Sequence, residues 1–176
     1  MRPALFALAA VAVFALPVAA QPADMGFVTG SLIEDFGPIA PVESDLAIPE
    51  GTDLKVAFDI SARTDDGALS KSFVTVARFM NMHFAAGVPA DHIHPAIVVH
   101  GQASKDLVIA ADGETNPNAP LIAALVEAGV PIYLCGQSAA ALGIAKDDLL
   151  PGVQMALSAM TAHALLADEG YSLNPF

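Results

Sequence analysis

The chain has one cysteine among its 176 residues, few basic side chains and no apolar run of transmembrane length, and each shortage excludes a class of protein. The single cysteine, Cys135, cannot form an intrachain disulfide. Without a Cys-x-x-Cys pair it also cannot act as a dithiol oxidoreductase. Seven Lys and Arg side chains stand against 19 Asp and Glu, a net charge of −12 at pH 7. This charge disfavours nucleic acids and anionic membrane surfaces as partners.

Patterns that bind nucleotides or metals are also missing. Neither Gly-x-Gly-x-x-Gly nor the phosphate-loop motif follows a predicted strand. His92 and His94 could bring two imidazoles to one face of an extended segment, but a zinc site would need further ligands nearby. The sequence therefore indicates no cofactor and no metal site.

Residues 1–20 have the features of a secretory signal peptide. Arg2 precedes an apolar stretch from Ala4 to Leu16, which is shorter than the roughly 20 residues that a membrane span needs. Residues 18–20 are close to the small-x-small cleavage pattern, so we expect cleavage after Ala20. The mature protein is then expected to be periplasmic or otherwise secreted, with no membrane insertion after the signal is removed.

Residues 21–53 form an acidic, proline-rich segment. Between residues 21 and 52 there are six carboxylates, four prolines and no Lys or Arg. Prolines interrupt regular hydrogen bonding, whereas apolar side chains such as Phe27, Ile33 and Phe36 are too numerous for a free tail. We expect an extended N-terminal arm that lies on the folded domain or on a neighbouring subunit.

From residue 54 to residue 176, short β-type runs alternate with helical ones, which is typical of a βαβ sheet. Strands are predicted at 54–60, at 96–100, in the apolar run that leads to Cys135, at 153–157 and at 171–173. Helices are predicted at 70–86, at 118–128, directly after Cys135 and at 158–169. The expected fold class is α/β: an open, mainly parallel four- or five-stranded sheet with helices on both faces, flavodoxin-like in architecture.

In such sheets, ligands bind outside the carboxyl ends of the strands. Cys135 ends one predicted strand, and the first amides of the following helix would favour its thiolate. His100 and Lys105 follow another strand, and each could lower the pKa of Cys135. Arg63, after the first strand, could hold an anionic substrate group. A buried, inert Cys135 and a purely structural His100 remain alternatives at this point.

Six segments together resemble the DsrE/DsrF-like family, whose members move sulfane sulfur on a cysteine persulfide. They are residues 76–83, 98–101, 105–107, 116–121, 132–138 and 149–153. The resemblance implies a DsrE-like α/β fold, assembly into homotrimers or homohexamers, and a sulfur-accepting cysteine that matches Cys135.

The chemistry that the resemblance implies has two steps. The Cys135 thiolate attacks a sulfane donor to give a persulfide, and the outer sulfur then passes to an acceptor thiol. His100 and Lys105 are the candidate catalytic helpers. Backbone amides after Cys135 would stabilise the negative sulfur. The candidate substrate-binding residues are Arg63, Asn116, Gly136, Gln137 and Ser138.

The export signal is a departure from the family, because its best-understood sulfur relays are cytoplasmic heteromeric complexes. We therefore expect an exported sulfur carrier or sulfurtransferase-like protein that meets a small sulfur-containing donor or an acceptor thiol. Two alternatives stay open. One is a small-molecule binding or sensing module in which Cys135 only packs, and the other is a structural homo-oligomer in which the helix at 70–86 makes subunit contacts.

Overall fold

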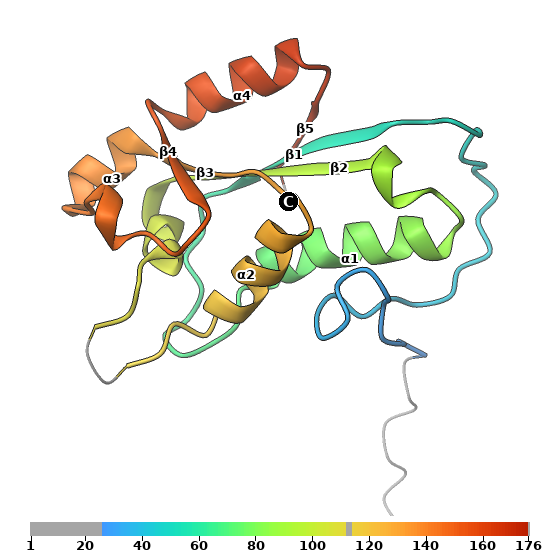
Figure 1. The fold of residues 1–176 in the computed structure, drawn as a ribbon, viewed down its shortest axis with the longest axis horizontal. Coiled ribbons are helices and arrows are strands. Elements are labelled where there is room, and N and C mark those ends of the chain that lie inside the picture. Colours follow the sequence, from blue (N-terminus) through green and yellow to red (C-terminus); the bar gives the residue numbers. More distant parts are fainter. Residues whose placement is uncertain (1–25, 112–113, 176) are drawn as a thin grey trace, which may run out of the picture.

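Five strands form one parallel sheet in the computed structural model, which describes residues 26–111 and 114–175 (Figure 1). The strands are β1 (Leu54–Ile60), β2 (Ile93–Val99), β3 (Ile132–Cys135), β4 (Val153–Ala156) and β5 (Ser172–Asn174). Their order in the sheet is β4-β3-β2-β1-β5, and each neighbouring pair is parallel. The predicted α/β sheet is thus confirmed. The expected signal peptide lies outside the described residues.

Helices cover both faces of this sheet. Helices α1 (Lys71–Ala85) and α2 (Ala119–Glu127) lie on one face, and α4 (Ala159–Asp168) lies on the other, as Figure 1 shows. Helix α3 (Gly136–Leu142) directly follows β3. The described residues also contain three 3-10 helices: η1 (Ala90–His92), η2 (Gly101–Leu107) and η3 (Lys146–Asp148). None of the helices described is both long and apolar enough to cross a membrane.

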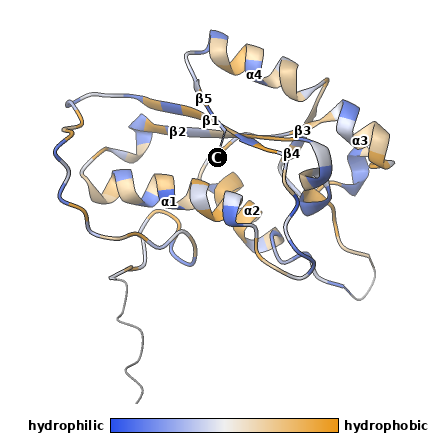
Figure 2. Cartoon of the chain, turned by 180° about the vertical axis from the view of Figure 1, so that it is seen from behind, coloured by the Kyte–Doolittle hydropathy of each residue, from blue (hydrophilic) through white to orange (hydrophobic). Residues whose placement is uncertain are grey.

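The two faces of the sheet have cores of different kinds. Large side chains such as Phe58, Ile97 and Leu134 fill the core under α1 and α2. The core under α4 is made of smaller residues: Ala57, Ala96, Val98, Ala162 and Leu166. Alternate residues of a strand point to opposite faces, so β1, β2 and β3 each supply both cores. Figure 2 shows the mainly hydrophobic colouring of α4 on its side of the sheet. Small side chains let this helix lie close to the strands.

Strand β2 begins at Ile93, earlier than the predicted 96–100, and contains Pro95. Proline lacks the N–H group that a strand in the middle of a sheet must donate. Strand β3 pairs with β2 only from Ile97 onward, whereas β1 pairs along its whole length. Pro95 therefore lies where β2 has a neighbour on one side only, and a proline is tolerated there.

The N-terminal arm is fixed to α1 through one buried side chain, that of Asn81. Its Oδ1 accepts hydrogen bonds from the amides of Leu32 and Ile33, at 3.0 and 2.9 Å. Its Nδ2 donates to the carbonyls of Ile33, Phe36 and Gly37. The described part of the arm thus lies on the domain, where Ile33 joins the core.

Candidate functional site

Cys135 lies where β3 ends and α3 begins, close to the amino ends of two helices. It is the last residue of β3 and the N-cap residue of α3, and only 6% of its surface is exposed. The Ser138 hydroxyl and the amides of Ser138 and Gln137, in the first turn of α3, act on the thiol and lower its pKa. A further amide comes from Ala159, the first residue of α4. The thiol is therefore held between the amino ends of two helices.

These groups and burial shift the pKa of the thiol in opposite directions. Burial raises the pKa of Cys135, because a buried charge loses its hydration. The Ser138 hydroxyl and the three amides outweigh burial and hold the pKa below the ordinary value of a thiol. A thiolate is the reactive form of cysteine, so the site favours a nucleophilic sulfur.

Neighbouring loops fix the residues that surround this sulfur. The Ser138 Oγ accepts a hydrogen bond of 2.9 Å from the amide of Gly101, at the start of η2. A Cβ atom on Gly136 would lie 2.7 Å from the carbonyl oxygen of Ala156, so glycine lets α3 begin close to the end of β4. The Gln137 Nε2 donates to the carbonyl of Leu157 at 3.2 Å. The predicted residues Gly136, Gln137 and Ser138 therefore lie together at Cys135.

His100 follows β2, the strand beside β3, and its ring is held by a carboxylate that the sequence did not nominate. The His100 Nε2 lies 3.2 Å from Oδ2 of Asp59, a residue of β1. His163 of α4 approaches the same carboxylate, with 2.8 Å between its Nε2 and Oδ1. No hydrogen bond joins His100 to Cys135 within the described part of the chain. The only local signal for Asp59 was a carboxylate that interrupts the apolar residues 56–60 of this strand.

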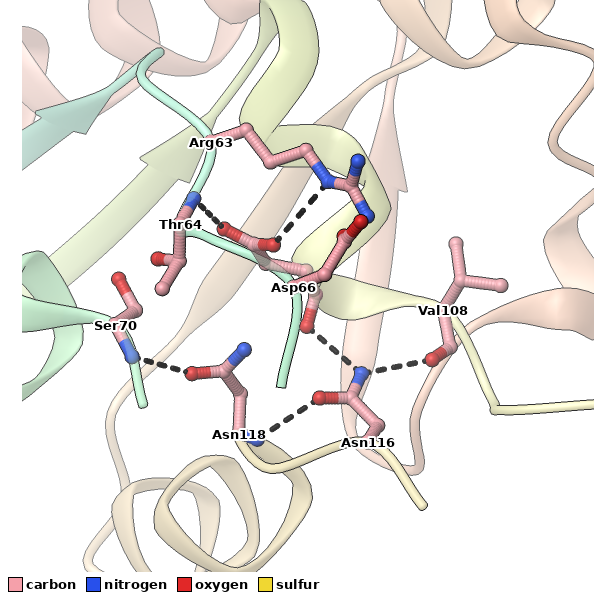
Figure 3. A network of polar contacts seen from close by, with 8 residues as sticks. Arg63, Thr64, Asp66, Ser70, Val108, Asn116 and Asn118 are labelled. Carbon is pink, nitrogen blue, oxygen red and sulfur yellow. Dashed lines mark hydrogen bonds and ion pairs between the residues drawn. The ribbon is translucent and has the colours of Figure 1, made fainter. Parts of the chain in front are cut away.

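Lys105, Arg63 and Asn116 line a different region, a polar cleft of about 660 Å³. Cys135 is not part of its lining. The Arg63 guanidinium pairs with Asp66 and lies 4.0 Å from the carboxylate of Asp106 (Figure 3). The structure thus separates the predicted residues into two groups, with His100 at the end of the strand beside that of Cys135 and the two cations in the cleft.

Asn116 organises the loop at the edge of this cleft (Figure 3). Its Nδ2 donates to the carbonyls of Asp106 and Val108, at 3.0 and 2.8 Å, and its Oδ1 accepts from the amide of Asn118 at 2.8 Å. Asn118 in turn accepts a 2.7 Å hydrogen bond from the amide of Ser70. Burial raises the pKa of Asp106, although hydrogen bonds from Thr64 oppose this. The side chain of Asn116 is thus used by the loop itself.

The remaining histidines lie away from the thiol. Asp53 Oδ1 lies 2.7 Å from Nδ1 of His92 and 3.8 Å from Nε2 of His94, at the amino ends of β1 and β2. His83 Nδ1 bonds to the Phe79 carbonyl one turn earlier in α1. Among the residues described, no group of three or more His, Cys, Asp or Glu side chains has the arrangement to hold a metal ion.

Comparison with known proteins shows the family to which the domain that carries these residues belongs. Residues 55–175 match the model of the DsrE/DsrF-like family. The fold is similar to that of a protein of unknown function, MTH1491, from Methanobacterium thermoautotrophicum, with a TM-score of 0.54 and 19% identity over 70% of this chain and 100% of that one. It is also similar to the ychN protein from E. coli, with a TM-score of 0.53 and 17% identity over 70% and 99% of the two chains. A search of curated proteins found no match.

Proposed function

Because the chain belongs to the DsrE/DsrF-like family, which associates it with sulfur transfer, we propose that it is an exported sulfur carrier that accepts sulfane sulfur as a persulfide on Cys135. One observation carries the proposal: the thiol lies at the amino ends of α3 and α4, where the Ser138 hydroxyl and backbone amides lower its pKa. Such a thiol is the nucleophile that attack on a sulfur–sulfur bond requires.

The loading step forms the persulfide without an outside oxidant. With thiosulfate as donor, the Cys135 thiolate forms a bond to the outer sulfur, the sulfur–sulfur bond of thiosulfate breaks, and sulfite leaves with the electron pair. In the return step, an acceptor thiolate attacks the outer sulfur of the persulfide and Cys135 leaves as a thiolate. The amides of Gln137, Ser138 and Ala159 favour Cys135 in the form that begins and ends this cycle.

Export is the second part of the proposal. It rests on the signal-peptide features of residues 1–20. The expected mature chain begins at Gln21 and is recovered from the periplasm or the culture medium. N-terminal sequencing of the protein from fractionated cells tests this, and a chain that retains residues 1–20 in the cytoplasm would contradict it.

Assembly into a homotrimer or homohexamer is the third part. Just before and along α4, the apolar side chains of Leu157, Met160 and Leu165 are 73%, 78% and 61% exposed. Leu157 and Leu165 line a hollow of about 220 Å³ beside the edge strand β4. Apolar side chains grouped on one surface favour contact with a partner. Light scattering should give three or six chains for the mature protein and a smaller particle for the Met160→Glu, Leu165→Glu variant.

The intact mass of the native protein tests the sulfur chemistry. After incubation with thiosulfate or polysulfide, we expect the mass to increase by one sulfur atom, and a reductant should remove it. The Cys135→Ser variant should gain nothing. Equal loading of both proteins would place the sulfur elsewhere and refute the proposal.

The burial of Cys135 favours a second candidate function. With 6% of the residue exposed, the thiol could serve only for packing in a small-molecule binding or sensing module of the same fold. A native thiol that resists iodoacetamide and gains no sulfur would favour this second function. Rapid alkylation in the native state would favour the sulfur carrier.

A further inference from the structure

A carboxylate shared by two imidazoles lies on β1, two strands away from the strand that carries Cys135, and has no part in the function proposed so far. Oδ1 of Asp59 lies 2.8 Å from Nε2 of His163 and 3.2 Å from Nε2 of His100, and Oδ2 also lies 3.2 Å from His100. The three side chains are between 20% and 34% exposed. They come from β1, the end of β2 and α4, so the fold itself brings them together.

The register of the sheet brings one member of this cluster, His100, beside the strand that carries Cys135. Val98 of β2 pairs with Tyr133 of β3, and both belong to the core under α4. His100, the extended residue that follows β2, and Cys135, the last residue of β3, each come two residues later, so continuing the register puts them on the same face with their backbones about 5 Å apart. His100 is thus between the carboxylate of Asp59 on one side and the strand that carries the thiol on the other.

Hydrogen bonding by the carboxylate fixes which ring nitrogen of His100 carries a proton. A carboxylate only accepts hydrogen bonds, so Nε2 of His100 must be the N–H donor to Asp59. In the neutral ring Nδ1 is then the acceptor and is free to take a proton. His163 donates to the same carboxylate in the same way, which holds Asp59 in place from the α4 side.

We propose that Asp59 and His163 are positioning residues that hold His100 as the acid–base group of Cys135. The proposal rests on the proposed function, because it assigns the proton transfers of the persulfide reaction. Nδ1 of His100 takes the proton of the Cys135 thiol. The thiolate then attacks the outer sulfur of a donor persulfide, the donor's sulfur–sulfur bond breaks, and the leaving thiolate takes the electron pair and the proton from His100. The net reaction converts a thiol and a persulfide into a persulfide and a thiol.

Other titratable groups also lie on the face of the sheet that α4 covers. Each of them either lies far from the end of the strands that carries the thiol or is not a histidine. The sheet supplies Lys55, His94 and Tyr133, and the segment around the end of α4 supplies Asp168, Glu169 and Tyr171. Lys55 donates to the Glu169 carbonyl and lies 5.9 Å from the centre of the Tyr171 ring. It precedes Asp59 by four residues on the same strand, so it belongs to the opposite end of the sheet.

The test is single-turnover sulfur loading of the full chain from glutathione persulfide, followed as a function of pH. The Asp59→Asn variant should load 10- to 100-fold more slowly, since acid–base catalysis contributes on the order of a hundredfold or more, and it should still reach one sulfur per chain. The His163→Gln variant should show a smaller loss in the same pH range. The matched control is Asp53→Asn, which removes the carboxylate that contacts His92 and His94 at the other end of the sheet. It should load at the wild-type rate.

The possible results separate this inference from the proposed function. If the wild-type protein loads and the Asp59→Asn variant matches it in rate and pH profile, the positioning role is wrong and the sulfur carrier stands. If the wild-type protein takes up no sulfur on Cys135, the proposed function itself is wrong. Nitrogen-15 NMR of the wild-type histidines gives a readout that does not depend on a variant's folding: His100 should carry its proton on Nε2, and a proton on Nδ1 of the neutral ring would overturn the inference.

Discussion

Replacing Ser138 with alanine should change the reactivity of Cys135 with little change to the fold. The Ser138 hydroxyl lowers the pKa of Cys135, as a donor to the thiolate would, and its Oγ accepts from the amide of Gly101, so it is the side chain that connects η2 to the thiol. Its removal leaves the amides of Gln137 and Ala159 in place. The variant therefore isolates the contribution of one hydroxyl to the thiolate.

The size of the effect follows from the kind of hydrogen bond that is lost. A hydrogen bond to a charged group stabilises it by about 1.5–3 kcal/mol, and about 1.4 kcal/mol corresponds to a tenfold change in a protonation equilibrium. The buried thiolate should therefore become about 10- to 100-fold less populated at a pH below its midpoint. The pH midpoint of alkylation should move upward by the corresponding amount.

The assay is the rate of iodoacetamide alkylation of native Cys135 between pH 5 and about 10, a range that includes ordinary thiol ionisation. Ser104→Ala is the matched control, because Ser104 is a buried serine whose hydroxyl has no hydrogen-bond partner among the described residues. It should leave the profile unchanged. An unchanged profile for Ser138→Ala, with the variant folded, would refute the assignment of the hydroxyl as a donor to the sulfur.

Three predictions concern the stability of the fold. Burial raises the pKa of Asp106 in the folded protein, so stability should fall as pH rises from about 4 through this raised pKa, and urea unfolding of Asp106→Asn should lack that slope. Burial raises the pKa of Asp59, but hydrogen bonds and charges from His163 and His100 outweigh burial and hold this pKa below the usual 3.8. The ionised Asp59 therefore stabilises the fold above about pH 4, and this stabilisation is lost as the pH falls. Urea unfolding should show that Asp59→Asn loses less stability than the wild type on acidification to about pH 2. Asn81→Ala should cost about 2–3 kcal/mol in urea unfolding and expose residues 26–40 to protease, whereas the exposed neighbour Met82→Ala should do neither; an equally protected arm in both would show that Asn81 does not hold it.

Local pattern was sufficient to predict most of the fold and the place of the thiol. Alternating β-type and helical runs placed the strands and helices close to where they are observed, and the junction after the apolar run located Cys135 at the amino end of α3. The predicted start of β2 was too late, because the prediction places Pro95 before the strand. A strand accepts a proline where it has a neighbour on one side only, as β2 does at Pro95. That information lies in the pairing, which the local sequence does not contain.

The composition of the site depended on contacts that no local pattern carries. Lys105 and Arg63 follow strands as Cys135 does, yet the path of η2 and the loop after β1 takes them to the separate cleft. Asp59 and His163 are 104 residues apart and meet only because α4 packs across β1 and β2. Which helix covers which face, and in what register, decides such contacts.

Transfer of sulfur from Cys135 to another thiol would distinguish a sulfur carrier from a protein that only packs this thiol. The native protein would be loaded with polysulfide, separated from the donor by gel filtration and mixed with glutathione, and the mass of both partners would be followed. We expect one sulfur atom to leave each Cys135 and to appear as glutathione persulfide or its product, and we expect Cys135→Ser to transfer none. A protein that never takes up sulfur on Cys135, or that transfers the same amount without this thiol, would contradict the proposed function.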